Sequence, residues 1–251
     1  QMGEMVGYQC TTPPGWETQD PMPGAQSLTG KPHAILVDQT GARYMNEGGS
    51  YELYCENMLK RDRTVPAVPS WAIFDARYID NYMLAGTFPG RNKPKAWTAE
   101  GYLRQAGSVE ELARQLGIDP AALRGTVERW NGFVDKGVDE DFHRGERAYD
   151  RWLGDPFHGP NPTLGRIDTA PFYAVPVVPG DVSTYGGVVT DACARVLRAD
   201  GSVIAGLYAT GVTTASVMGG VYPGAGASIG PSLTFGYVAA RHAAGLAAAP
   251  G

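Results

Sequence analysis

The sequence predicts a fold that mixes helices with sheets, of the α+β and α/β classes, and three observations carry this prediction. Short apolar runs bounded by turn residues, such as residues 33–38 and 71–75, are typical of strands. Between residues 108 and 137 the apolar positions recur at helical spacing instead. After residue 171 strand-like runs return and lead through a glycine-rich loop into a final helix.

The amino-terminal part of the chain alternates loops with short regular elements. Residues 1–30 are rich in Pro, Gly and Met without periodicity, so we expect a loop with at most one short helical piece. The apolar run at residues 33–38 enters a tight turn at residues 39–41, and residues 43–47 are expected to form the return strand. A helix is expected over residues 51–61.

Two adjacent helices carry clear start and stop signals. Ser108 and Glu111 form a capping box, and Gly117 ends the helix that follows. Asp119 caps a second helix, which has proline at its first position and ends at Gly137. The positions expected to face the core are Leu112, Leu116, Leu123, Val127, Trp130, Phe133 and Val134.

The remaining chain is expected to be a polar loop followed by strands. Residues 138–165 interleave acidic and basic side chains, which predicts a solvated loop. Residues 199–201, Ala-Asp-Gly, are a hairpin signal, and residues 207–211 resemble a buried strand that ends in glycine. The other expected elements are strands over residues 172–178, 187–190, 194–197 and 202–204 and a helix over residues 231–244.

Charge and hydropathy exclude several classes of function. The formal net charge of −5 argues against a nucleic-acid partner, which usually meets a basic face. No uninterrupted apolar run approaches the roughly 18 residues of a membrane span, and the first residues lack the pattern of a signal peptide. We therefore expect neither a nucleic-acid partner nor an integral membrane segment.

Cysteines and histidines are too scattered to predict a metal site or a disulfide framework. The three cysteines are odd in number and far apart, which fits a reducing cytoplasmic location. The four histidines are equally dispersed, so no metal ligand is predicted. These residues are Cys10, Cys55, Cys193, His33, His143, His158 and His242.

The stretch over residues 206–236 carries the strongest chemical signal. It reads as a strand, a glycine-studded loop and the start of a helix. Glycines remove side chains from the loop and expose backbone N–H groups to a flat or anionic ligand. The helix start near Gly230 adds partial positive charge, which would stabilise a reduced flavin. A glycine-rich surface loop that only caps a helix remains the alternative.

The run GLYATG…ASVMGGVYPGAGASIGPSLTFGYVAARHAAG closely resembles the end of the 3-ketosteroid dehydrogenases, which belong to the fumarate reductase and succinate dehydrogenase flavoprotein superfamily. The segments GARYMNE, LRGTVERWNGFVDKGVDEDFHRG, APFYAVPVVPGDVSTYGG and GSVIAGLYATG resemble the wider superfamily. The resemblance implies FAD as cofactor, a steroid substrate and an external electron acceptor. It also implies a Rossmann-like FAD-binding domain with an inserted α+β catalytic domain.

The resemblance assigns residues 30–180 to the inserted catalytic domain and residues 1–29 and 181–251 to the FAD-binding domain. No strand followed by G-x-G-x-x-G occurs near the start, whereas such flavoproteins carry that element in an amino-terminal unit. We therefore expect the chain to be the carboxyl-terminal half of its protein and to need the amino-terminal half as a partner.

Catalytic roles follow from the resemblance residue by residue. The tyrosine and second glycine of the family's YPGxG motif match Tyr222 and Gly226. Their hydroxyl and backbone N–H would donate to the steroid C3 oxygen as a proton leaves C2. The family's general base matches Tyr51, with Tyr54 as the second choice, and the hydride from C1 would go to flavin N5. Flavin contacts are implied at Gly211, Val212, Gly226, Ala227, Ser228 and Ile229.

Two departures from the superfamily refine this hypothesis. Val212 stands where the family commonly places Asn and wider relatives place Glu, so its side chain forms no hydrogen bond to the cofactor. Residues 183–185 and 221–224 lack the histidine and arginine of fumarate reductases, which favours a neutral ketone over a dicarboxylate.

Three alternatives to 1,2-dehydrogenation of a 3-ketosteroid stay open. The first is 4-ene ketosteroid dehydrogenation, for which relatives place other polar groups in the YPGxG loop, where Ala225 stands here. The second is reduction or dehydrogenation of another enone or of a carboxylate. The third is a chain that is inactive without its amino-terminal half.

Overall fold

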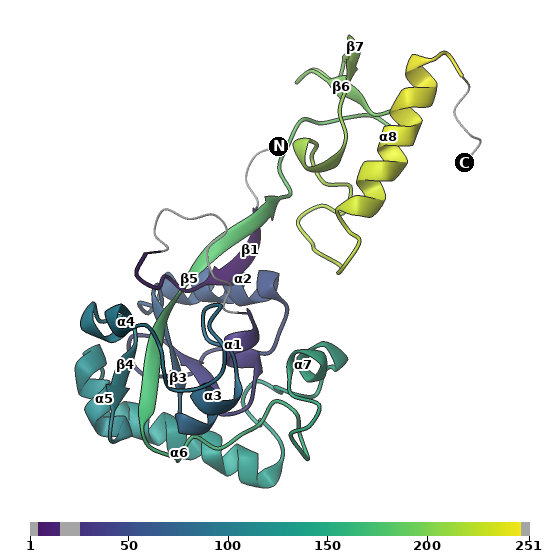
Figure 1. Cartoon of the computed structure of the whole chain (residues 1–251). Helices are drawn as coiled ribbons and strands as arrows, with labels where there is room; N and C mark the ends of the chain where they lie inside the picture. The colour runs from purple at the N-terminus through teal and green to yellow at the C-terminus, as the bar shows by residue number, and fades with distance from the viewer. Residues whose placement is uncertain (1–4, 16–25, 247–251) are drawn as a thin grey trace. The chain divides into compact units, whose positions relative to one another are not determined.

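The computed structural model describes residues 5–15 and 26–246. Its chain forms two compact units (Figure 1). The larger unit comprises Gly7–Gly180, and the smaller unit comprises Gln1–Val6 with Asp181–Gly251. The sequence-based division differs at the amino terminus, where it grouped residues 1–29 with residues 181–251. The assignment of these units to catalytic and cofactor-binding roles stays a proposal.

The larger unit is built on a sheet whose strands follow the order β1-β5-β3-β2, with β4 added beside β5. The β2–β3, β3–β5 and β4–β5 pairs are antiparallel, so that Ile73 of β3 lies opposite both Ile35 and Ala174. The strands are β1 (Met5–Cys10), β2 (Ala34–Val37), β3 (Ser70–Phe74), β4 (Arg104–Ala106) and β5 (Phe172–Thr184).

Both faces of this sheet are covered, which explains why every residue of β2 is buried. One face packs Ile35, Val37 and Ile73 against the apolar sides of α5 and α6. The other face packs Leu36 and Phe74 against side chains of α2 and α3. The helices of this unit are α1 (Gln26–Gly30), α2 (Tyr51–Asp62), α3 (Ala76–Asn81), α4 (Lys95–Ala99), α5 (Val109–Leu116), α6 (Pro120–Lys136) and α7 (Ala148–Leu153).

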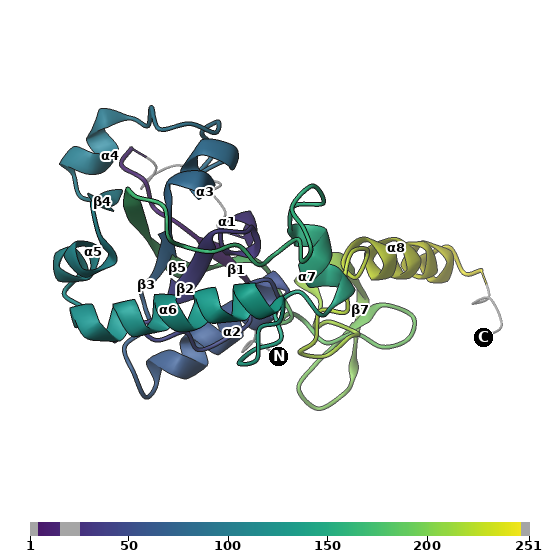
Figure 2. The same cartoon turned by 90° about the horizontal axis from the view of Figure 1, so that it is seen from below.

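The capped helices form as predicted. The Ser108 hydroxyl accepts a hydrogen bond from the Glu111 N–H, and the Asp119 carboxylate accepts one from the Ala121 N–H. Gly117 and Gly137 end the two helices in the left-handed conformation. The helices α5 and α6 then pack side by side along the sheet (Figure 2).

Three expectations for this unit are wrong. Residues 5–10, expected as loop, form β1. Residues 43–47, expected as a strand, form no regular element, and Arg43 and Glu47 of this segment bond each other through their side chains. Residues 138–165 are not a solvated loop: they contain α7, and Asp139, Arg144 and Asp150 are completely buried.

The smaller unit pairs a hairpin with a long helix. The strands β6 (Arg195–Leu197) and β7 (Val203–Tyr208) are antiparallel and are joined by the predicted turn, where Gly201 has a φ of 82°. A short 3-10 helix, η1 (Gly211–Thr213), leads to the glycine-rich loop and to α8 (Ile229–Ala243).

Two expectations for the smaller unit fail. The strand expected over residues 187–190 is reduced to isolated bridges at Val188 and Thr190. Residues 207–211 do not form a separate buried strand: Leu207 and Tyr208 end β7, whose residues are exposed or half-buried because the hairpin has only two strands. Among residues 5–15 and 26–246, no helix is both long enough and apolar enough to cross a bilayer.

Candidate functional site

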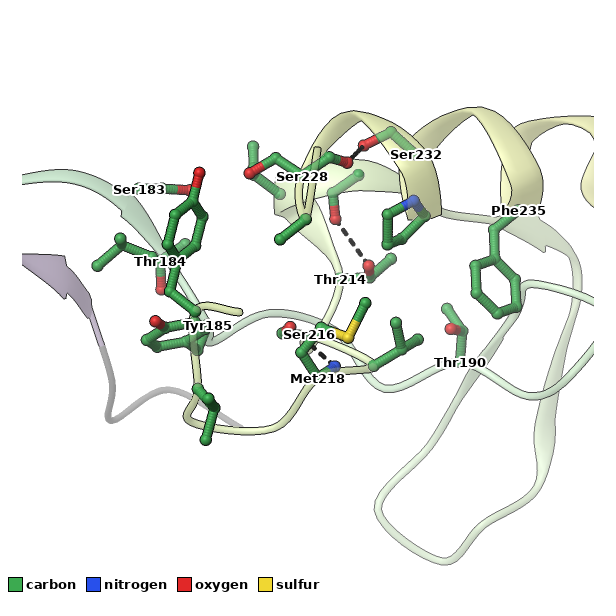
Figure 3. Close-up of a pocket in the computed structure, with 18 of the residues that line it drawn as sticks. Ser183, Thr184, Tyr185, Thr190, Thr214, Ser216, Met218, Ser228, Ser232 and Phe235 are labelled. Carbon is green, nitrogen blue, oxygen red and sulfur yellow. Dashed lines mark hydrogen bonds between the residues drawn. The ribbon is translucent and has the colours of Figure 1, made fainter. Parts of the chain in front are cut away.

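A hollow at the start of α8 gathers most of the residues predicted to contact a cofactor (Figure 3). Side chains of Ser228, Ser232 and Phe235 meet those of Thr214 and Met218 around it (Figure 3). Its volume of about 50 Å³ is far below the roughly 300–1,000 Å³ of a pocket that encloses a small molecule. The hollow therefore cannot enclose a small molecule by itself, and its lining forms an open wall at the start of α8.

The lining of this hollow is uncharged. It combines hydroxyls with apolar side chains and contains no Lys, Arg, His, Asp or Glu. A surface of this composition offers no cationic side chain to pair with a carboxylate. The lining residues are Val6, Ser183, Thr184, Tyr185, Thr190, Ala209, Gly211, Val212, Thr214, Ser216, Val217, Met218, Val221, Tyr222, Ala227, Ser228, Pro231, Ser232 and Phe235.

The loop before α8 depends on glycine for its backbone conformation. Gly224 has a φ of 136° and Gly226 a φ of 95°, values that side-chain-bearing residues rarely adopt. A Cβ atom at Gly226 would meet no heavy atom of the structure within 4 Å, so crowding inside this chain does not explain the glycine. Its backbone conformation does explain it. Tyr222 is half-buried and lines the hollow beside this loop.

The end of β7 is tied to the first turn of α8. The Thr210 hydroxyl donates a 2.9 Å hydrogen bond to the Ser232 carbonyl. A Cβ atom on Gly211 would lie 3.1 Å from the Ser232 hydroxyl oxygen, so the two segments approach closely. These contacts hold the positive end of the helix at the hollow, where it would favour negative charge on a ligand.

Several predicted cofactor contacts fall around this helix start. Gly211, Val212, Ala227 and Ser228 line the hollow, whereas Gly226 and Ile229 are exposed beside it. Val212 is 55% exposed. Its apolar side chain has no hydrogen-bonding group in the place where the family commonly carries Asn. Ser228 begins α8 without a side-chain capping bond, and its carbonyl accepts a 2.6 Å hydrogen bond from the Ser232 hydroxyl.

The two tyrosines considered as general base lie in the larger unit and differ sharply in environment. Tyr51 is the first residue of α2, is half-buried, and packs its ring 5.5 Å from the Tyr8 ring. Tyr54 is completely enclosed, and its hydroxyl is 3.1 Å from the Thr29 hydroxyl. Burial raises the pKa of the Tyr54 hydroxyl well above its ordinary value, which disfavours ionisation. The geometry thus favours Tyr51 over Tyr54.

A buried ion cluster supports the segment that leads to Tyr51. The Arg43 guanidinium donates two 2.7 Å hydrogen bonds to the Glu47 carboxylate and also binds Asp139. The ring of Trp130 packs against the guanidiniums of Arg43 and Arg144, 4.6 and 4.9 Å from its centroid. Sequence reasoning missed this cluster because its members are spread over a hundred positions.

The histidines and cysteines give no sign of a metal centre. The rings of His33 and His158 meet edge to face at 5.2 Å, although 125 positions separate them. Among the described residues, no three His, Cys, Asp or Glu side chains gather to hold an ion. The cysteines form no disulfide.

The chain is similar to known flavoproteins in sequence. A model of the family described as FAD binding domain matches residues 8–229. The chain is 45% identical over 243 residues to a 3-oxosteroid 1-dehydrogenase of Mycolicibacterium smegmatis, covering 93% of this chain and 43% of that protein. It is 41% identical over 221 residues to a 4-oxocyclohexanecarboxylate 2-dehydrogenase of Sinomonas cyclohexanicum, covering 86% and 38%.

A solved structure extends this likeness to the fold. The chain matches a 3-ketosteroid Δ1-dehydrogenase from Sterolibacterium denitrificans, in complex with 1,4-androstadiene-3,17-dione, at 37% identity and a TM-score of 0.89. The match covers 96% of this chain and 43% of that one, and it confirms the predicted fold class. The chain thus spans about two fifths of the length of the relatives named here.

Proposed function

This chain belongs to the FAD-binding domain family of flavoproteins, and from that premise we propose that it forms part of an enzyme that desaturates a 3-ketosteroid between C1 and C2. The observation that carries the proposal is the uncharged wall at the start of α8, which bears Tyr222 and lies beside the glycine-rich loop. Relatives named as 3-oxosteroid 1-dehydrogenases support it.

The residues at this wall fit a flavin. Cβ atoms on the loop glycines would meet no heavy atom within 4 Å, so a flat ring system can approach the backbone closely. The first turn of α8 directs its positive end toward the same place, which suits a reduced flavin ring with negative charge. Bound there, FAD would supply a two-electron oxidant for the hydride that leaves C1. The glycines are Gly219, Gly224, Gly226 and Gly230.

In this proposal the chain's own residues handle the proton and the developing charge. The Tyr51 oxygen takes the proton from C2, and its place at the start of α2 favours a negative charge there. The Tyr222 hydroxyl and the Gly226 backbone N–H donate to the C3 oxygen as charge builds on it. Both donors come from one short loop, whose conformation the glycines fix.

A second candidate substrate is a smaller cyclic ketone that bears a carboxylate. The relative from Sinomonas cyclohexanicum, named for 4-oxocyclohexanecarboxylate, shares 41% identity with this chain and supports this reading. The absence of any charged side chain from the described lining opposes it, because the lining offers a carboxylate hydroxyl donors but no cationic partner.

Turnover by the complete protein that carries this chain tests the proposal. With an artificial electron acceptor, a 3-keto-4-ene steroid should be oxidised, with kcat/KM at least tenfold above that for 4-oxocyclohexanecarboxylate. Fumarate and succinate should give no turnover. A preference for the carboxylate would establish the second candidate instead, and fumarate reduction would contradict both.

A further inference from the structure

Tyr51, the proposed base, follows a turn that is held from another part of the larger unit. The Asn46 side-chain oxygen accepts a 2.8 Å hydrogen bond from the Gly48 N–H, and the Asn46 carbonyl accepts one of 3.3 Å from the Gly49 N–H. Ser50 then caps α2, and Tyr51 is the first helical residue. The direction in which Tyr51 leaves the turn therefore depends on the conformation of Asn46.

Asp150 fixes that conformation. The Asn46 amide donates a 3.0 Å hydrogen bond to the Asp150 carboxylate, across 104 positions of sequence. The same carboxylate oxygen accepts a 3.1 Å bond from the Gly145 N–H. Only one orientation of the Asn46 amide satisfies both partners, with its oxygen toward Gly48 and its nitrogen toward Asp150.

The acceptor side of this bond is closed to solvent, whereas Asn46 is half-buried. Asp150 is completely buried, and one of its carboxylate oxygens has no hydrogen-bond partner. A Cβ atom at Gly48 would lie 3.5 Å from the Asp150 Cβ and 3.6 Å from the Arg144 Cγ, so the turn packs directly against both residues. A buried carboxylate that keeps an unpaired oxygen is an expensive feature for stability alone.

We propose that Asp150 is a positioning residue for Tyr51: through Asn46 it sets the turn from which the base projects. The inference rests on the function proposed above. The charge-assisted bond is stronger than a neutral one, and the complete burial of Asp150 limits competition from water on its side of the bond. Because α7 carries Asp150, this short helix acts as a fixed support for the start of α2.

Exchanging donor and acceptor tests the proposal in the complete protein. Asn46→Asp keeps the acceptor for Gly48 but sets two carboxylates against each other, so we expect C2 hydrogen exchange to slow by about tenfold or more. Asp150→Asn alone should slow exchange less, because its amide oxygen still accepts. The double variant restores a bond of opposite polarity to residue 46 but leaves the Gly145 N–H without its acceptor, so it should recover only part of the loss and still exceed Asn46→Asp alone by about threefold.

A matched control separates positioning from simple loss of stability. Asn131 is also buried, and its side chain bonds the backbone of Ile167 rather than the turn. Asn131→Asp should lower the melting temperature and leave the exchange rate per bound flavin within about twofold of wild type. Steroid affinity, read from the perturbed flavin spectrum, should stay near wild type in all these variants.

The outcomes are distinct. Normal exchange in Asn46→Asp, or a double variant no better than Asn46→Asp alone, would overturn the inference while leaving the proposed function intact. Normal exchange in Tyr51→Phe, measured alongside, would show that Tyr51 is not the base. That result would contradict both the positioning role of Asp150 and the role of Tyr51 in the proposed function. Slow exchange in Asn46→Asp, recovery in the double variant and an unaffected Asn131→Asp would support the positioning role.

Discussion

The hydroxyls of Thr29 and Tyr54 lie 3.1 Å apart in the closed interior of the larger unit. This contact uses the Tyr54 hydroxyl for structure, while burial raises the pKa of that hydroxyl. The contact therefore bears directly on which tyrosine of α2 serves as base, since a phenolate at Tyr54 would be desolvated.

The first prediction compares the two tyrosines in the complete protein. Tyr51→Phe should abolish exchange of the C2 hydrogen with solvent, while the steroid still binds and perturbs the flavin spectrum. Tyr54→Phe should retain most activity and destabilise the protein by about 1 kcal/mol, because the Thr29 hydroxyl loses a partner. The reverse pattern would move the base to Tyr54.

The second prediction concerns Tyr222. Tyr222→Phe removes one donor to the C3 oxygen and should cost about 3 kcal/mol of transition-state stabilisation, or roughly a hundredfold in rate. Exchange in this variant should recover as the pH rises, because the base tyrosine survives and ionises. Tyr237→Phe is the control: Tyr237 lies on α8, is 60% exposed and does not line the hollow. Equal losses in both variants would argue against a specific role for Tyr222.

The parts of the fold that the sequence predicted are those set by neighbouring residues. Asp119, Pro120 and Gly137 define α6 from within one segment, and the structure reproduces it. The burial of Arg144 could not be predicted in this way. Its guanidinium donates to the carbonyls of Ala34, Lys31 and Thr163, which lie 110, 113 and 19 positions away in the sequence. A charged stretch looks solvated until distant partners are known.

Some residues of the candidate site could likewise be predicted from neighbouring residues, and others could not. The glycine-rich loop with Tyr222 was identified from one contiguous motif, because the loop supplies its own backbone conformation. Choosing between Tyr51 and Tyr54 needed the tertiary structure, since both lie on one helix and only packing into the core encloses the second. Asp150 gave no local signal, because its role depends on Asn46, 104 positions away.

The third prediction concerns stability at acid pH. Burial alone would raise the pKa of the Asp139 carboxyl, but hydrogen bonds and charge from Arg43, with bonds from backbone N–H groups, hold that pKa below its ordinary value. The stabilisation is therefore complete above the unfolded-state pKa of about 3.9. It is lost as the pH falls through the lower folded-state pKa.

Urea unfolding of the complete protein at a series of pH values checks this sign. The urea concentration at the unfolding midpoint of wild type should decrease as the pH falls below about 4. Asp139→Asn should start lower at neutral pH, because Arg43 keeps only Glu47, and should fall less steeply with acid. Glu128→Gln, at an exposed position, should follow wild type. A parallel curve for Asp139→Asn would assign the acid sensitivity to other carboxylates.

The fourth prediction separates backbone conformation from crowding in the loop before α8. Gly226 has a φ of 95°, so Gly226→Ala forces strain of about 1–3 kcal/mol and displaces the N–H that is proposed to meet the C3 oxygen. Gly220 has no positive φ and equally open surroundings, so Gly220→Ala is its matched control.

In the complete protein, Gly226→Ala should lower kcat by about ten- to a hundredfold with FAD retained, because one oxyanion donor is misplaced. Gly220→Ala should stay within about twofold of wild type. Equal activity of the two variants would show that the Gly226 amide does not take part in the reaction.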